Sequence, residues 1–152
     1  MKLSTKGRYG LRAMVDMAVN GEDGPVSILS IAKRQSISEN YLEQIIALMK
    51  KANLVFSIRG ATGGYTISRP LEEISVGDIL RALEGDLSLV NCPGITEDGE
   101  VKAGGCEASD LCVTKYVWSK ANKAVADAFD SISLKELAEE SKKILEERKW
   151  KI

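Results

Sequence analysis

The stretch from residue 27 to residue 68 constrains the fold of this 152-residue chain more than any other. Apolar residues recur in it at positions i, i+3, i+4 and i+7, the spacing of one buried helix face: Leu42, Ile45, Ile46 and Met49. They predict a helix over residues 38–51, with Ser38 placed to cap its start. A shorter helix over residues 28–35 precedes it, and only two residues separate the pair, as in a helix-turn-helix.

A predicted β-hairpin follows the second helix directly. Residues 54–59 alternate as a strand does, residues 65–68 form a second short run, and glycine-rich residues 60–64 join them. Core packing alone would explain the helices or the hairpin taken singly. The ordered combination favours a winged helix-turn-helix domain that binds double-stranded DNA.

The rest of the chain is predicted to be helical, so the fold class is mainly α with one small hairpin. The expected helices cover residues 5–20, 76–84, about 110–130 and 134–147, and Ser109 is expected to cap the third. Residues 1–70 hold 10 Lys and Arg against 5 Asp and Glu, whereas residues 71–152 hold 11 against 17. We expect a DNA-binding domain over residues 1–70, and a cysteine-bearing loop with dimerisation helices over residues 71–152.

The long helix near residues 110–130 is the expected homodimer seam. A stripe of small residues lets another helix approach closely, and operator-binding proteins commonly pair symmetric subunits: Ala121, Ala124 and Ala128. Packing within one subunit is the alternative interpretation.

Several protein classes are not expected. No apolar run approaches the roughly 18 residues that a membrane span needs. The N-terminus lacks the apolar core of a signal peptide, so we expect a cytoplasmic protein. An enzyme is not expected, because the chain has neither histidine nor a Gly-Lys-Ser/Thr phosphate loop.

Three cysteines lie in or just beyond a glycine-rich, aperiodic stretch, residues 91–110: Cys92, Cys106 and Cys112. An odd number of clustered thiols in a cytoplasmic chain argues against a disulfide framework. Soft thiolates suit iron–sulfur clusters and zinc, although neither spacing matches the C-x2-C zinc pattern. The residues leave open a metal or iron–sulfur site, a thiol redox switch, or incidental thiols.

Five segments are similar, in order, to those of one known family: residues 1–10 (MKLSTKGRYG), 41–44 (YLEQ), 59–65 (RGATGGY), 75–80 (SVGDIL) and 112–118 (CVTKYVW). On them the chain resembles the IscR-like iron–sulfur regulators, dimeric winged-helix transcription factors that carry a cluster. The resemblance implies that Cys92, Cys106 and Cys112 ligate a cluster, of the 2Fe-2S type.

The same resemblance implies how DNA is bound. The helix over residues 38–51 would enter the major groove, the wing would meet the minor groove, and Glu43 would tune which sequences are accepted. The implied DNA-contacting residues are Ser38, Asn40, Tyr41, Glu43, Gln44, Arg59 and Gly60.

Two features depart from the family pattern. The first two cysteines stand farther apart than in the best-known members, and Lys115 occupies the place of the histidine that is the fourth ligand there. A lysine amine is protonated near neutral pH and is a poor replacement. The fourth ligand could be Glu107, Asp110, another carboxylate or an external thiol. Competing functions are a nitric-oxide sensor with a 4Fe-4S cluster and a cluster-free thiol switch.

Overall fold

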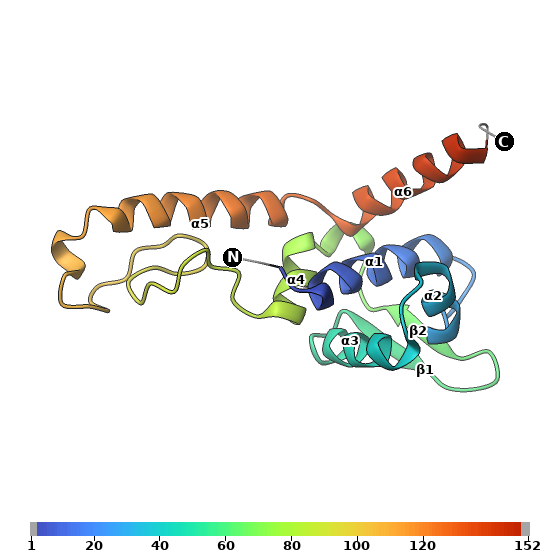
Figure 1. Cartoon of the computed structure of the whole chain (residues 1–152). Helices are drawn as coiled ribbons and strands as arrows, with labels where there is room; N and C mark the ends of the chain where they lie inside the picture. Colours follow the sequence, from blue (N-terminus) through green and yellow to red (C-terminus); the bar gives the residue numbers. More distant parts are fainter. Residues whose placement is uncertain (1–2, 150–152) are drawn as a thin grey trace.

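A mainly helical body with one antiparallel hairpin makes up the computed structural model, which describes residues 3–149 (Figure 1). Among these residues, no helix combines the length and apolarity needed to cross a bilayer. The order of elements confirms the predicted fold class: α1 (Thr5–Asn20), α2 (Ile28–Gln35), α3 (Glu39–Lys51), β1 (Val55–Ile58), β2 (Gly64–Ile67), α4 (Val76–Glu84), α5 (Thr114–Asp130) and α6 (Leu134–Lys149), with 3-10 turns η1 (Leu71–Glu73) and η2 (Ser109–Leu111).

Side-chain caps fix most of the predicted helix starts. The Ser38 hydroxyl accepts a backbone N–H bond at 3.3 Å at the start of α3. Ser75 and Asp78 complete a reciprocal capping box at the start of α4, with both bonds at 3.0 Å. Gly85 ends α4 with a φ of 81°, a conformation that favours glycine. Each cap satisfies backbone groups that the helix itself leaves unpaired, which is why these boundaries could be predicted.

The hairpin is held against the helical body through its second strand. β1 and β2 pair from Val55↔Ile67 to Ile58↔Gly64. Val26, in the connection from α1 to α2, exchanges two backbone hydrogen bonds of 2.9 Å with Tyr65 of β2. These bonds fix the base of the wing to the helical body.

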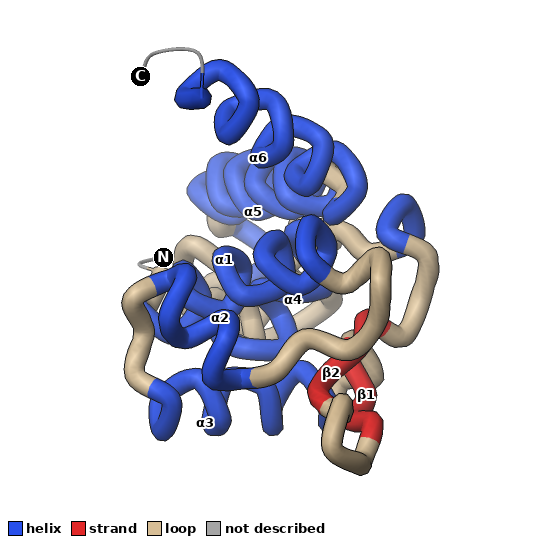
Figure 2. The backbone as a smooth tube through the Cα atoms, turned by 90° about the vertical axis from the view of Figure 1, so that its right-hand side faces the viewer, coloured by secondary structure: helices blue, strands red, loops and turns tan. Residues whose placement is uncertain are grey.

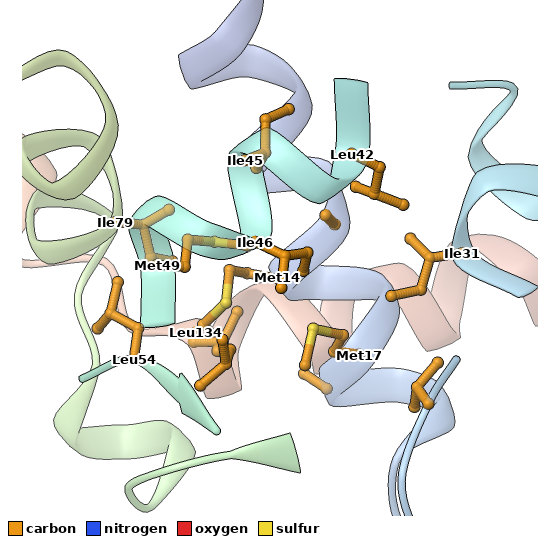
Figure 3. Close-up of a cluster of buried hydrophobic side chains, with 14 of the residues drawn as sticks. Met14, Met17, Ile31, Leu42, Ile45, Ile46, Met49, Leu54, Ile79 and Leu134 are labelled. Carbon is orange, nitrogen blue, oxygen red and sulfur yellow. The ribbon is translucent and has the colours of Figure 1, made fainter. Parts of the chain in front are cut away.

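α1 lies at the centre of the body, with α3 on one side and α6 on the other (Figure 2). Its Met14 and Met17 meet Leu42 and Met49 of α3 in a buried cluster (Figure 3). Leu134 of α6 is fully buried in the same cluster. The core thus draws on both halves of the chain, while the division of function at residue 70 stays a prediction.

α5 projects from this body as an arm, and the cysteine-bearing loop runs beside it (Figure 1). The predicted start of this helix near residue 110, with Ser109 as its cap, is wrong. Ser109–Leu111 form a separate 3-10 turn, and Cys112 has an extended backbone with ψ of 95°, so α5 begins only at Thr114. Leu111, which the predicted helix would have included, is 94% exposed.

Candidate nucleic-acid interface and cysteine-bearing loop

α3 buries one face completely and leaves the other in solvent. Its four apolar stripe residues are at most 1% exposed. The opposite face carries exposed polar and small side chains: Asn40, Glu43, Gln44, Ala47 and Lys51. A helix presented in this way can lay its outer face into a groove of DNA without disturbing the core.

Two of the predicted DNA-contacting residues also hold α3 in place. The hydroxyl of Ser38 is engaged as the helix cap. Tyr41 is half-buried, and its ring stands edge-on to that of Tyr9 in α1, with centroids 6.0 Å apart and an interplanar angle of 81°. Such aromatic pairs favour one relative orientation, so this contact helps to fix α3 on α1.

The wing tip carries the two remaining predicted residues, Arg59 and Gly60, and both are exposed. Gly60 has a φ of 124°, which only glycine adopts readily. Lys50 near the end of α3 donates to the Ser57 hydroxyl of β1 at 3.0 Å. This bond, which the sequence did not predict, ties the wing to α3, and both elements lie at the same end of the molecule (Figure 2).

A buried carboxylate joins α1 to α2. Asp16 accepts hydrogen bonds from the Arg34 guanidinium at 2.6–3.2 Å and from the Gln35 amide at 2.8 Å. Its side chain is only 1% exposed, and its hydrogen bond raises the pKa of Arg34. A lone acid inside the apolar run of residues 13–19 was the signal that could have revealed this partner, because buried charges are normally paired.

The three cysteines are free thiols of unequal access. Cys106 is exposed, whereas Cys92 and Cys112 are half-buried. The Cys112 sulfur lies 3.2 Å from the Thr114 hydroxyl, and this hydrogen bond, helped by the backbone N–H of Lys115, lowers the pKa of Cys112. Cys112 therefore forms a thiolate more readily than an ordinary exposed thiol does.

The backbone brings the three cysteine segments towards Gly94. A Cβ at Gly105 would lie 2.8–2.9 Å from backbone atoms of Pro93 and Gly94, so the Cys106 segment passes directly over the Cys92 segment. The Lys115 side chain covers the same place, with its Nζ 3.5 Å from where a Cβ of Gly94 would stand. A side chain at position 105 would clash with this backbone, which explains the glycine there.

The sulfur atoms themselves are not gathered into a binding site. Within residues 3–149, no three Cys, His, Asp or Glu side chains are placed to hold a metal ion. Cys112 and Asp110 line an open hollow of about 560 Å³ together with residues 101–103 and the start of α5. The loop thus offers suitable donors and a close-packed backbone. The three thiols would have to move closer to one another to bind one metal ion or cluster.

Comparison with known proteins settles the family. The family described as Rrf2, iron-dependent transcriptional regulator, matches residues 3–140. The chain belongs to the Rrf2 family. The HTH-type transcriptional regulator IscR of Klebsiella pneumoniae is 36% identical over 90% of this chain and 79% of its own length.

Two solved structures extend this similarity to the whole fold. IscR of T. potens is 43% identical, with a TM-score of 0.71, covering 93% of this chain and 88% of its own. CymR, the global cysteine regulator of B. subtilis, is 40% identical, with a TM-score of 0.72, covering 91% and 97%. This Rrf2-family protein is therefore a DNA-binding transcription regulator and not an enzyme.

Two polar residues that hold the loop of this Rrf2-family regulator were not predicted. Asn122 of α5 is 2% exposed; its amide oxygen accepts from Leu89 N at 3.0 Å, and its nitrogen donates to Thr96 O at 3.1 Å. Its spacing of three and four residues from the apolar Val125 and Ala126 was a usable signal, because a buried amide needs partners. Arg81 of α4, which pairs with Glu97, gave no such signal, because most arginines are simply solvated.

Proposed function

We propose that the protein is a homodimeric regulator that binds double-stranded operator DNA and senses iron–sulfur cluster supply through Cys92, Cys106 and Cys112. It acts in the cytoplasm, and the cluster is of the 2Fe-2S type. The observation that carries the proposal is that one Rrf2-family chain combines two features. These are the exposed polar face of α3 and three free thiols in the loop beside α5.

The exposed face of α3 supports its role as the major-groove helix. Amide side chains such as Asn40 and Gln44 read adenine by paired hydrogen bonds, and a carboxylate such as Glu43 accepts from cytosine. Ser38 and Tyr41 stand at the N-terminal end of the helix, the end that contacts base edges in helix-turn-helix proteins.

The wing supports a second contact on the flanking minor groove. Arg59 is exposed beside Gly60, so its guanidinium can enter a narrow minor groove, where the negative potential is enhanced. The bond from Lys50 to Ser57 links β1 of the wing to α3. Both elements can therefore reach DNA from the same end of the molecule (Figure 2).

The donor chemistry fits an iron–sulfur group at three positions. Thiolates are the ligands such clusters take, and the cluster would supply an oxidant-sensitive centre to the arm. The lowered pKa of Cys112 favours its thiolate, and the glycine at 105 lets the Cys106 segment approach the Cys92 segment. For the fourth position Asp110 shares the hollow with Cys112, and Glu107 is exposed beside Cys106. Another carboxylate or an external thiol is equally compatible with the donor set.

Exposed apolar side chains support a homodimer. The first turns of α5 and the residues before it carry several that a single chain leaves in solvent: Leu111, Val113, Tyr116, Val117 and Trp118. Along α5, residues 114–130, only Asn122 and Ala126 are buried. Exposed apolar surface on this scale is typical of an interface, and a second copy would cover it together with the small-residue stripe.

Thiol oxidation without a cluster is the second candidate function. Its supporting observations are the exposed Cys106, the lowered pKa of Cys112 and the similarity to a cysteine regulator of B. subtilis. Cys106 and Cys112 would then be the reactive pair, because thiolate character and exposure set thiol reactivity. A nitric-oxide sensor with a 4Fe-4S cluster would use the same three cysteines.

Anaerobic reconstitution with iron and sulfide tests the proposal. The protein should become coloured, with a visible absorption spectrum of the 2Fe-2S type, and Ala at Cys92, Cys106 or Cys112 should abolish the colour. Operator affinity should then differ between the coloured and the metal-free protein.

Each alternative has its own outcome in the same experiment. A 4Fe-4S spectrum that nitric oxide bleaches would favour the nitric-oxide sensor. Colourless protein with bound zinc would overturn the cluster. Metal-free protein whose operator affinity changes with diamide, and recovers with dithiothreitol, would favour the thiol switch. Sedimentation equilibrium of each form checks the homodimer.

A further inference from the structure

Arg81 joins three segments that lie far apart in the sequence. Its Nη1 and Nη2 bond the two carboxylate oxygens of Asp130, the last residue of α5, at 2.7 and 2.9 Å. Its Nε pairs with Glu97, which lies in the loop between Cys92 and Cys106. The guanidinium geometry suits two carboxylates held in fixed directions, so α4 is clamped to both the arm and the loop.

The loop segment that Glu97 belongs to is held from both sides. The second Glu97 oxygen accepts from Leu87 N at 3.2 Å, which closes the segment on itself. Asn122 and Ser119 of α5 hold the opposite side through Thr96 O and Gly99 O. Residues 87–99 therefore form an anchored turn whose displacement would be resisted at Arg81.

α4 is packed directly against α1 and α3. One turn after Arg81, Glu84 accepts three hydrogen bonds of 2.6–3.0 Å from Ser4 and Gly7 at the start of α1. A Cβ at Gly10 would lie 2.0 Å from Leu83 of α4 and 3.3 Å from Ile45 of α3. The helices α1, α3 and α4 thus meet without slack, and close-packed interiors transmit strain.

We propose that Arg81 is a positioning residue that couples the cysteine-bearing loop to the DNA-binding helices through Glu97. The proposal rests on the proposed sensing role of the cysteines. Because their sulfurs are not gathered among the described residues 3–149, bringing them to one centre must pull on the segment between Cys92 and Cys106. The anchored turn transmits this displacement to Arg81, and α4 transmits it to α1 and α3.

The test compares operator affinity in the metal-free protein and after reconstitution with iron and sulfide. For the wild type we expect a ratio of roughly 5- to 150-fold, the usual range of allosteric coupling, and for Glu97→Gln a ratio below about twofold. The glutamine keeps an acceptor for Leu87 N but loses the charge, so the metal-free affinity and the absorbance per chain should not change. Those two unchanged values separate lost coupling from a merely structural defect.

Glu100→Gln is the matched control, because Glu100 is an exposed acid of the same loop outside the Arg81 ion pairs. It should keep the wild-type ratio. Arg81→Lys, which cannot bridge both carboxylates, should lower the ratio as Glu97→Gln does, and the double variant should add nothing further.

The outcomes separate the two proposals. A coloured wild-type protein with equal operator affinity in both states would overturn the proposed function and the coupling with it. A wild type that responds, together with a Glu97→Gln protein that keeps the full ratio, would overturn the coupling alone. A ratio lost equally in Glu100→Gln would also overturn it, because the effect would then be one of loop charge.

Discussion

Glu43 is the acid at the centre of a surface that is proposed to meet a polyanion. It is exposed on the outer face of α3, between Asn40 and Ala47 along the helix. Within residues 3–149 its carboxylate makes no hydrogen bond or ion pair. The substitution Glu43→Ala should therefore change the free energy of unfolding by no more than about 0.5 kcal/mol, as for other unpaired surface residues.

The expected effect on DNA recognition is much larger. A carboxylate in the major groove is repelled by phosphates and loses hydration unless a base-edge donor such as the cytosine N4 amine meets it. One such contact discriminates between bases by about 1–3 kcal/mol. Losing it corresponds to about a 5- to 150-fold smaller ratio of operator to scrambled-site affinity. Affinity for the operator itself should change little, because lost repulsion offsets the lost hydrogen bond.

The assay is a pair of titrations, on operator and on scrambled DNA of equal length, at one fixed salt concentration. Glu39→Ala is the matched control: Glu39 is exposed one turn earlier on the same helix and carries the same charge. Both variants should bind scrambled DNA more tightly, but only Glu43→Ala should lose discrimination. If Glu43→Ala discriminates as well as the wild type, this face of α3 does not read bases at that position.

Three further predictions address the wing, the core and an ion pair. Arg59→Ala should weaken operator binding by about 1–3 kcal/mol, and unchanged affinity at moderate salt would mean that the wing does not touch DNA. Leu134→Ala should lower the free energy of unfolding by about 2–5 kcal/mol, because Leu134 is fully buried in the core shared with α3. Urea unfolding curves of the two proteins measure this difference. The hydrogen bond from Arg81 lowers the pKa of Asp130. The ion pair of Asp130 with Arg81 should therefore stabilise the fold fully above the unfolded-state pKa of about 3.9, and this contribution should vanish as pH falls through the lower folded-state pKa. Urea unfolding midpoints of the wild type and Asp130→Asn, compared across this pH range, would reveal it.

Local signals predicted most of the fold. The observed bounds of α1 and α2 match the predicted residues 5–20 and 28–35, because periodicity and caps act within a few residues of each other. The start of α5 was predicted wrongly: Ser109 begins a short 3-10 turn, Cys112 has an extended backbone, and α5 begins only at Thr114. Alternation and glycines predicted the wing. They did not predict the hydrogen bond that links it to α3, from Lys50 to Ser57 seven residues later.

The candidate site was predicted unevenly for the same reason. The exposed face of α3 follows from helical periodicity alone, so the sequence was enough to place its residues. The arrangement of the cysteine-bearing loop depends on long-range pairs, such as Asn122 with Leu89 and Arg81 with Glu97. Sequence spacing carries no record of such pairs, and the loop therefore looked structureless from residue 91 to residue 110.

The anchored turn, residues 87–99, affects whether the three thiols can bind one cluster. Ordering all nineteen residues from 92 to 110 would cost about 19–38 kcal/mol at about 1–2 kcal/mol per residue, whereas a structural metal site supplies only about 10–16 kcal/mol. Residues 92–101 are already held by Asn122, Ser119 and an Ile95–Val101 bridge, and residues 109–110 belong to the 3-10 turn η2, which leaves residues 102–108 around the exposed Cys106. The cost for these seven residues is about 7–14 kcal/mol, which ligation can offset. The same anchoring removes slack between Cys92 and Glu97, so a displacement of Cys92 reaches Arg81, whereas residues 102–108 take up the movement of Cys106.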